Sequence, residues 1–407
     1  MKIALVHDFL REYGGAERVV ETLHEMWPEA PLYTSFVDWE NLGNQGYRFK
    51  NWDIRTSWVQ DNWLVKKFHS PLRFLAPKIW ESFDLSDYDV VISSSGWFMC
   101  RGIRTWRAEV GAPWFSRRQG PDLVSSHYRT PAKAVTALET ARLTAHRAPL
   151  HICYIHHPPR NLYGYATGSD LQKYWPVRVY AAIVNFFLRH YDFETAQRVD
   201  FFIANSKETA RRVEKFYRRD STVIYPPVDL SEFHLKKTKE EYFLALNRLV
   251  RGKGVEVIVE AATKLGIPLK VAGTGPQMES LKAAAGKNVQ FLDWVSDEKR
   301  VKLLSNAKAL IVAAEDEDFG ITSIEAQAAG TPVIAPASGG FLETVIDGKT
   351  GLLYGGVGIV TAGNLIEALQ KYERVKFNPE DCRKNAEKFS KVRFKKEILD
   401  LVEKNFK

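Results

Sequence analysis

The stretch Glu317-Asp-Phe-Gly-Ile-Thr-Ser-Ile-Glu325 carries two glutamates at a spacing that suits ligand binding. It follows an apolar segment typical of a buried strand and opens a segment typical of a helix. A loop carboxylate such as Glu317 accepts strong hydrogen bonds from sugar hydroxyls, and the amides at a helix N-terminus bind phosphate. Gly320 lets the backbone approach a ligand closely. We therefore expect Glu317, Gly320 and Glu325 to hold a sugar nucleotide.

The same stretch also fits a structural interpretation. Residues 315–318 form an acidic run that is typical of a solvated loop. Thr322 and Glu325 have the spacing of a helix capping box. Taken alone, the stretch leaves both interpretations open.

Two cations in Asn247-Arg-Leu-Val-Arg-Gly-Lys253 favour the ligand interpretation. Arg248 and Lys253 come just after the first expected strand of this half, where they would stabilise the negative charge on a departing diphosphate without a metal. Arg251 leaves an ordinary basic loop open. Gly273-Thr-Gly-Pro276 ends the next expected strand as a tight turn. Because ligands bind at the carboxyl ends of parallel strands, these features predict one shared site.

In the first half of the chain, Gly14-Gly15 and His156 are the matching candidates. Gly14-Gly15 lies after a first expected strand that ends at His7 and before an expected helix, a position suited to a phosphate loop, although a plain turn also fits. His156 follows another expected strand. His157 beside it leaves open which histidine matters.

Apolar strands and amphipathic helices alternate along the chain, which predicts a doubly wound parallel sheet in each half. The stiff Pro226-Pro227 pair marks the boundary between them. The expected strands are residues 2–7, 89–95, 151–155, 201–204 and 222–225, then 242–249, 269–272, 289–295, 309–314, 331–335 and 351–354. Asn205 and Glu208 have capping-box spacing for a helix after residue 204. A final helix is expected from Lys391 to Lys404.

Residues 104–149 interrupt this alternation with an Arg-rich stretch that lacks apolar periodicity. A structureless excursion of this length is unusual inside a domain. Three interpretations are open: a surface insertion, a basic lid or membrane-contacting arm, or a stretch read in an altered frame. Between Arg101 and Leu150 the net charge is +6, out of +8 for the whole chain. Charge confined to one segment argues against a nucleic-acid-binding face.

The composition of the 407 residues, with 45% hydrophobic and 26% charged, is typical of a soluble globular protein. Three widely spaced cysteines provide neither a disulfide framework nor a zinc site, so we expect a cytoplasmic protein. The N-terminus lacks signal-peptide anatomy, and the most apolar stretch, Val177 to Leu188, is too short to cross a bilayer. A basic-aromatic set would suit anionic lipid headgroups, although partly buried aromatics also explain it. This set comprises Trp58, Trp63, Lys66, Lys67, Phe68 and Trp80.

The chain resembles the large family 4 of retaining glycosyltransferases, which have the GT-B fold. The residues that carry the resemblance are the Glu-x7-Glu pair at Glu317 and Glu325, the cations Arg248 and Lys253, the Gly-x-Gly-Pro turn at Gly273 to Pro276, the linker-like Tyr225 to Asp229, the glycine loop Gly14 to Glu17, and His156. The likeness covers nearly the whole chain except residues 104–149.

The resemblance implies an α/β GT-B architecture, with two Rossmann-like domains facing a central cleft. Residues 1–226 would form the acceptor-side domain, 227–388 the donor domain, and 389–407 a helix packing back on the first domain. It implies catalytic roles for His156, Arg248, Lys253 and Glu317. It implies donor binding by Gly14, Gly15, Gly273, Phe319, Gly320, Ile321 and Glu325. Neither a cofactor nor a metal is expected.

The implied reaction is transfer of a hexose with retention, to a glycan or lipid-linked acceptor. Glu317 to Ile321 followed by Glu-Ala-Gln-Ala-Ala-Gly330 is similar to mannosyltransferases of polysaccharide or lipid-linked glycan assembly, which favours GDP-mannose, with a UDP-sugar second. A peripheral contact with an anionic membrane on its cytoplasmic face is open, and a nucleic-acid partner is not expected. A sugar-nucleotide 2-epimerase and a non-catalytic sugar-nucleotide binder are the rival functions. A dehydrogenase is disfavoured because neither half opens with Gly-x-Gly-x-x-Gly after its first strand.

Overall fold

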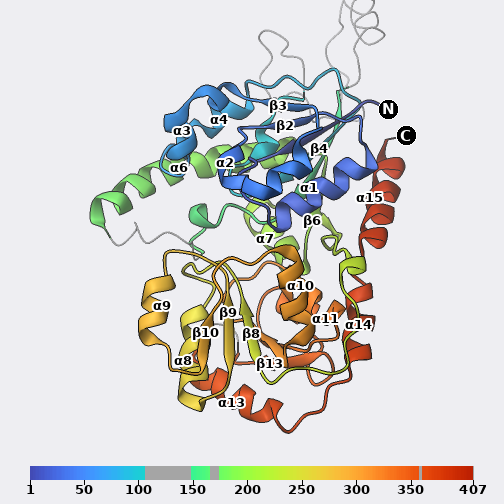
Figure 1. The fold of residues 1–407 in the computed structure, drawn as a ribbon. Helices are drawn as coiled ribbons and strands as arrows, with labels where there is room; N and C mark the ends of the chain where they lie inside the picture. Colours follow the sequence, from blue (N-terminus) through green and yellow to red (C-terminus); the bar gives the residue numbers. More distant parts are fainter. Residues whose placement is uncertain (106–147, 166–173, 357–359, 407) are drawn as a thin grey trace, which may run out of the picture.

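A computed structural model of the protein describes residues 1–105, 148–165, 174–356 and 360–406. Two parallel β-sheets form two α/β layers that lie one above the other (Figure 1). We call the part built on the seven-stranded sheet the first domain and the part built on the six-stranded sheet the second domain. The Arg-rich stretch lies almost entirely outside the described residues, so its three interpretations stay open.

The first sheet has the strand order β3-β2-β1-β4-β5-β6-β7, and all its pairings are parallel. Its strands are β1 (Ile3–His7), β2 (Leu32–Thr34), β3 (Ile54–Thr56), β4 (Val90–Ser95), β5 (Leu150–Ile155), β6 (Phe201–Ala204) and β7 (Ser221–Val223). Its helices are α1 (Gly15–Met26), α2 (Trp39–Leu42), α3 (Trp63–Lys67), α4 (Ala76–Trp80), α6 (Trp175–Arg198) and α7 (Lys207–Tyr217).

The second sheet has the order β10-β9-β8-β11-β12-β13 and is also parallel throughout. Its strands are β8 (Phe243–Leu246), β9 (Leu269–Ala272), β10 (Val289–Phe291), β11 (Ala309–Ile311), β12 (Val333–Pro336) and β13 (Gly351–Tyr354). Its helices are α8 (Val255–Leu265), α9 (Met278–Ala284), α10 (Asp297–Asn306), α11 (Ile321–Ala328), α12 (Phe341–Thr344), α13 (Ala362–Tyr372) and α14 (Pro379–Glu387), and α15 (Lys391–Asn405) follows them. The predicted pair of doubly wound sheets is confirmed.

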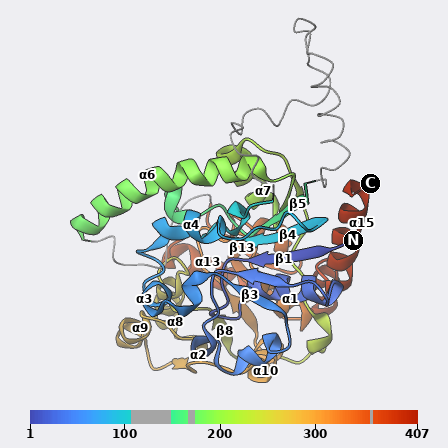
Figure 2. The same cartoon turned by 90° about the horizontal axis from the view of Figure 1, so that it is seen from above.

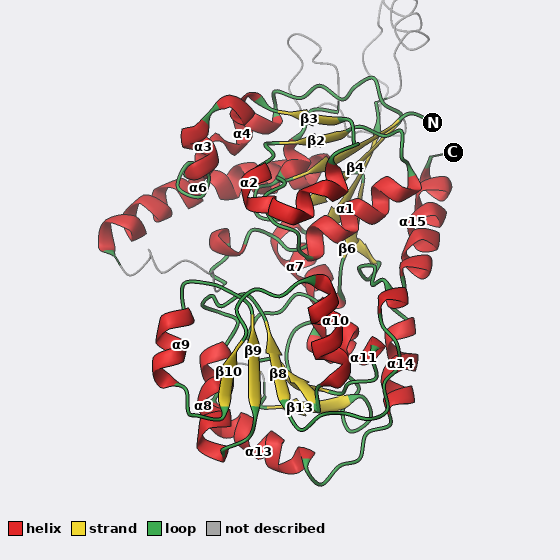
Figure 3. Ribbon diagram, in the orientation of Figure 1, coloured by secondary structure: helices red, strands yellow, loops and turns green. Residues whose placement is uncertain are grey.

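Each sheet is buried on both faces, which is why its strands read as continuous apolar runs. In β8, Phe243 and Ala245 pack into one core and Leu244 into the opposite one, because successive side chains alternate across a strand. In β1, Leu5 and Val6 divide between two cores in the same way. The helices surround both sheets (Figure 3).

The last helix returns to the first domain, and the two chain ends lie close together (Figure 1). Phe394, Ile398 and Val402 of α15 are buried in the same core as Leu5 of β1. Where the chain passes between the domains, Val228 pairs with the residues around Ser390 in a parallel bridge. The outgoing and returning segments therefore lie side by side.

Several local expectations were wrong. Strands β8, β10, β11 and β12 are shorter than predicted, whereas β9 and β13 have the predicted bounds. Strands β2 and β3 were not predicted. Ser206, and not Asn205, caps α7, because its side chain accepts the Thr209 amide. Helix α11 begins after Gly320 without a side-chain cap, so the capping box at Thr322 is absent.

Helix α6 extends beyond the body of the first domain (Figures 1 and 2). Its second half packs into the core through Leu188 and Tyr191, whereas its first half is largely exposed. Within the described residues, no helix has both the length and the apolar character needed to cross a membrane.

Candidate active site

A cleft of about 1710 Å³ separates the two domains and is lined by residues of both. It lies at the carboxyl ends of the parallel strands. In each sheet the strand order reverses beside the first strand of the domain, β1 or β8, and this is where open α/β sheets bind ligands. The loops after β1, β5, β8, β9 and β11 all contribute to its walls. These loops hold the residues that the sequence predicted.

Lys253 and Glu317 form an ion pair inside the cleft, with 2.7 Å between Lys253 Nζ and Glu317 Oε2. Their side chains are 23% and 20% exposed. Burial alone raises the pKa of Glu317, but the Lys253 ammonium and the charge of Arg160 together lower it by more, so the pKa lies below its usual value. The carboxyl group therefore stays ionised, and it can accept hydrogen bonds from sugar hydroxyls.

The N-terminus of α11 follows the Glu317 loop and faces the same cleft. Gly320 has φ +87°, and a Cβ there would lie 2.8 Å from Phe341 Cε1, so both conformation and space require glycine. The Ser323 hydroxyl lines the cleft, is buried, and has no hydrogen-bond partner among the described residues. An unsatisfied hydroxyl at a helix N-terminus suits a phosphate oxygen. The ring of Phe319 is buried between Tyr225 and Phe389, so it supports the loop from beneath.

Glu325 lies one turn inside α11 and joins the two domains. Its Oε1 accepts hydrogen bonds from Arg18 of α1 and from Arg300 of α10. Burial raises the pKa of this carboxyl, but the two arginines lower it by more, so it lies below its usual value. The expected contact of Glu325 with a ribose stays a prediction. In this arrangement its partners are two arginines.

Arg248 does not take part in the Lys253–Glu317 ion pair. Its side chain is 64% exposed and bonds to Glu12 of the first domain, with Nη1 2.9 Å from Oε1. Both residues line the cleft. Gly273 also lines it with φ +134°, and a Cβ there would lie 1.9 Å from the carbonyl oxygen of Asn247. This close packing of two strand-end loops explains the glycine.

The glycine loop meets α11 across the cleft. The Gly14 amide, which was expected to face the donor phosphates, instead donates to Glu17 Oε2 at 2.8 Å. A Cβ on Gly15 would lie 2.7 Å from Ile321 Cδ1. Gly15 therefore allows the two domains to approach, and Ile321 covers it.

His156 belongs to a buried hydrogen-bond chain at the ends of β1, β4 and β5. Its Nε2 lies 2.7 Å from Ser94 Oγ, which is 3.2 Å from His7 Nδ1, and His7 Nε2 lies 3.4 Å from Glu17 Oε1. Burial lowers the pKa of His156 well below its usual value, with His7 and His157 adding to the effect. A neutral imidazole can donate a hydrogen bond to a sugar hydroxyl, or accept one from it, without placing a positive charge beside the sugar. His157 also lines the cleft, but its Nδ1 is 3.0 Å from the Pro158 carbonyl oxygen.

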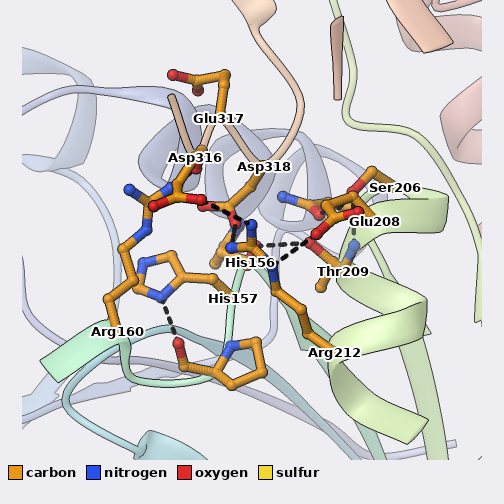
Figure 4. Close-up of polar contacts among 12 residues, drawn as sticks. His156, His157, Arg160, Ser206, Glu208, Thr209, Arg212, Asp316, Glu317 and Asp318 are labelled. Atoms are coloured by element: carbon orange, nitrogen blue, oxygen red, sulfur yellow. Dashed lines mark hydrogen bonds and ion pairs between the residues drawn. The ribbon is translucent and has the colours of Figure 1, made fainter. Parts of the chain in front are cut away.

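Asp318 fastens the Glu317 loop to the first domain. Its Oδ2 lies 2.6 Å from Arg160 Nη2 and its Oδ1 lies 2.7 Å from Arg212 Nη1. Figure 4 shows the two arginines on opposite sides of this carboxylate. Burial raises the pKa of Asp318, and Arg160, His157 and Arg212 lower it by more, so the group is ionised. Charge-assisted pairs of this kind fix the orientation of the loop.

Sequence reasoning missed most of the residues that form the cross-domain contacts: Glu12, Arg18, Arg212, Arg300 and Asp318 were not predicted as site residues. Arg18 and Arg300 stand in the first turns of helices that follow strands, so their position was a usable signal. For Arg212 and Asp318 the sequence contained no such signal, because their pairing depends on how the two domains pack together. Among the described residues, no cluster of three or more His, Cys, Asp or Glu side chains could hold a metal ion.

This combination of two doubly wound domains and a cleft of strand-end loops is the architecture of the GT-B fold. Residues 13–232 match the model of Glycosyltransferase Family 4, and residues 229–389 match that of Glycosyl transferases group 1. The chain belongs to glycosyltransferase family 4.

Curated relatives are similar at low identity. An uncharacterized glycosyltransferase of Methanocaldococcus jannaschii is 27% identical over 58% of this chain and 61% of its own length. The alpha-1,3/1,6-mannosyltransferase alg2 of Schizosaccharomyces pombe is 27% identical over 39% of this chain and 41% of its own. D-inositol 3-phosphate glycosyltransferase of Mycobacterium tuberculosis is 31% identical over 40% and 39%. Each match spans less than two thirds of the relative.

Solved structures share the fold over the whole chain. Sucrose-phosphate synthase from Thermosynechococcus elongatus superposes with a TM-score of 0.66 at 16% identity, covering 100% of this chain and 99% of that chain. Anabaena HepE in complex with UDP-glucose gives a TM-score of 0.63 at 15% identity, covering 99% and 100%. These likenesses confirm the predicted GT-B fold.

Proposed function

We propose that this protein is a retaining, metal-independent glycosyltransferase that transfers mannose from GDP-mannose to a glycan or lipid-linked acceptor. The observation that carries the proposal is the Lys253–Glu317 pair, held in the cleft beside the N-terminus of α11. It places a cation, an ionised carboxylate and free helix-terminal groups together. A sugar diphosphate needs these three partners for its phosphates and its hydroxyls.

The proposed substitution occurs on one face of the sugar. The bond from the anomeric carbon to the phosphate oxygen breaks, and its electron pair leaves with the nucleoside diphosphate. The acceptor hydroxyl forms the new bond on the same face, and its proton passes to the departing phosphate oxygen. Lys253 stabilises the charge that develops on this leaving group, and Arg248 joins it once it is released from Glu12.

Glu317 and His156 bind the sugar in this proposal. Glu317 accepts hydrogen bonds from sugar hydroxyls, and the neutral His156 meets the sugar from the first domain. The pairs Asp318–Arg160 and Glu325–Arg18 hold the cleft closed, which excludes water and limits hydrolysis of the donor. A hydrolytic pair of carboxylates is not part of the mechanism, because Glu317 is held in an ion pair with Lys253 and Glu325 is bound by two arginines.

The donor is inferred from the Glu317 to Gly330 sequence pattern and from relatives. One curated relative is named a mannosyltransferase, which supports GDP-mannose. Anabaena HepE was solved with UDP-glucose, so a UDP-sugar is the second candidate.

The test is a panel of GDP- and UDP-sugars, first in thermal shift and then in turnover. A matching donor stabilises the folded protein by about 2.7 kcal/mol at a concentration of 100 times its Kd. We expect GDP-mannose to raise Tm most, and NMR of the product to show the anomeric configuration of the donor. Glu317→Gln should abolish the shift produced by the sugar. Glu260→Gln, an exposed carboxylate paired with Lys264 on α8, is the matched control.

Each other outcome identifies a different function. A free rearranged sugar formed without acceptor would indicate a 2-epimerase. A donor-induced shift without turnover on any acceptor would indicate a non-catalytic binder. An inverted product would exclude the retaining mechanism.

A further inference from the structure

The exposed half of α6 carries an apolar stripe on its solvent side. Trp175, Val179, Ile183, Phe186 and Phe187 are 69%, 51%, 57%, 66% and 67% exposed. Their spacing of four, four, three and one residues places them on one face of the helix. A surface helix ordinarily turns polar side chains outward, so this helix presents the reverse pattern.

Other side chains of the same helix attach it to the first domain. Tyr180 donates a hydrogen bond from its hydroxyl to the Pro71 carbonyl oxygen, and Asn185 Oδ1 lies 2.6 Å from Arg73 Nη2. Farther along, Leu188 is buried in the core. Since these contacts hold α6 in place, the outward stripe is a fixed surface and not a frayed end.

A second group of exposed apolar side chains lies on the segment that α6 contacts. Trp63 and Phe68 at α3 and Phe74 just beyond are 67%, 43% and 47% exposed. Helix α3 and helix α6 lie on the same side of the first domain in both views (Figures 1 and 2). We call the α6 stripe and this group the apolar surface.

Within the two segments that carry the apolar surface, the charges have one sign. Residues 62–80 and 174–191 contain six lysines and arginines and no aspartate or glutamate. Lys67 and Arg178 among them are exposed. A second copy of this chain packed face to face would bring these like charges together, whereas an anionic lipid surface would neutralise them.

The apolar surface also borders the active-site cleft. Pro176, Val177, Tyr180 and Ala181 of α6 line the same cleft as Lys253 and Glu317. The exposed part, residues 175–187, is about 20 Å long at 1.5 Å per residue. This is too short to cross a hydrocarbon core of about 30 Å, but it suits a helix that lies in the headgroup region.

We propose that the apolar surface docks on an anionic lipid bilayer and brings the mouth of the cleft to the membrane, where a lipid-borne acceptor presents its hydroxyl. The inference of a docking surface depends only on the exposure of its apolar side chains and on the sign of the charges among them. Only the nature of the acceptor rests on the proposed function. With the helix stripe in the headgroup region, the acceptor's apolar chain stays in the bilayer while its polar head enters beside Val177 and Tyr180.

The test is flotation of the purified full chain with vesicles of phosphatidylglycerol and phosphatidylcholine, and with vesicles of phosphatidylcholine alone. The wild type should float with the anionic vesicles. Ile183→Ser/Phe186→Ser/Phe187→Ser should lower the bound fraction at least about tenfold, because each apolar side chain that enters the interface contributes roughly that factor. Lys67→Glu/Arg178→Glu should weaken binding to the anionic vesicles selectively.

The matched control is Val392→Ser/Leu399→Ser, which removes exposed apolar side chains (80% and 40% exposed) from α15. It should float like the wild type. Donor-induced thermal shifts of all variants, which do not depend on lipid, should be unchanged and show that they are folded. If no donor raised the Tm of the wild type, the proposed function would be refuted, whereas the docking proposal would still be decided by flotation.

Three results would overturn the docking proposal. The first is a wild type that does not float, and the second is a triple variant that floats as well as the wild type. The third is a wild-type dimer in light scattering that the triple variant converts to monomer without any lipid binding, which would assign the surface to self-association.

Discussion

Replacing Lys253 with methionine separates the structural from the catalytic role of the cleft ion pair. The substitution keeps the length of the side chain and removes its charge, so Glu317 loses its partner at 2.7 Å. Removing one partner of a fully buried pair costs about 3–5 kcal/mol. Since both side chains are about one fifth exposed, we expect the lower end, about 3 kcal/mol.

The double variant Lys253→Met/Glu317→Gln tests this reasoning. It removes both charges, so no unpaired carboxylate remains, and its stability should return to within about 1 kcal/mol of the wild type. Thermal unfolding measures the difference, because about 3 kcal/mol corresponds to roughly 6–12 °C for a unit of this size. Both variants should lose about 10²–10³-fold in kcat, since each lacks the cation at the leaving group.

Lys264→Met is the matched control, because it breaks an exposed lysine–glutamate pair on α8 with a 2.6 Å contact. An exposed pair contributes about 0–1 kcal/mol, so Tm and kcat should hardly change. The reasoning is refuted if Lys253→Met melts like the double variant, or if it retains wild-type kcat.

Three further predictions concern the contacts between the domains. Asp318→Asn should lower the free energy of unfolding by about 3 kcal/mol at pH 7, as measured by urea denaturation. Two arginines hold the pKa of Asp318 below its usual value in the folded protein. The difference in stability between wild type and variant should therefore shrink as the pH falls below about 3.9, where this aspartate takes up a proton in the unfolded chain first. Gly15→Ala should raise the donor KM about tenfold, because its methyl group would lie 2.7 Å from Ile321 Cδ1, and Ile321→Ala should restore it. Glu343→Gln should cost about 1 kcal/mol and speed hydrogen exchange at the start of α7, since this second-domain carboxylate accepts the first two amides of that helix at 2.8 and 3.1 Å.

Much of the fold was predictable because parallel strands buried on both faces are apolar throughout and alternate with amphipathic helices. The alternation identified most strands and the two-sheet arrangement. Strands β2 and β3 were not predicted, because these three-residue segments lie outside the apolar runs that identified the equally short strands β7, β10 and β11. The α7 cap was assigned one residue early because Asn205 and Ser206 are both good capping residues.

The candidate site was partly predictable. Lys253 and Glu317 come together because both follow neighbouring strands of one sheet, and strand ends are a position that sequence reveals. Arg248 was expected beside them, but its exposed side chain forms an ion pair with Glu12 of the opposite domain. The Gly14 amide was expected to face phosphate, but it donates its hydrogen bond to the carboxylate of Glu17, three residues along the chain.

By itself, the sequence determined the family, the two parallel sheets and the donor-side loops, because these depend on local periodicity and on motifs within one domain. Only the tertiary structure decided which charges meet across the cleft, such as Asp318 with Arg160 and Arg212, and which face of α6 stays uncovered. Such contacts join residues more than a hundred positions apart. Their energy depends on burial and geometry, and neither exists until the two domains are packed together.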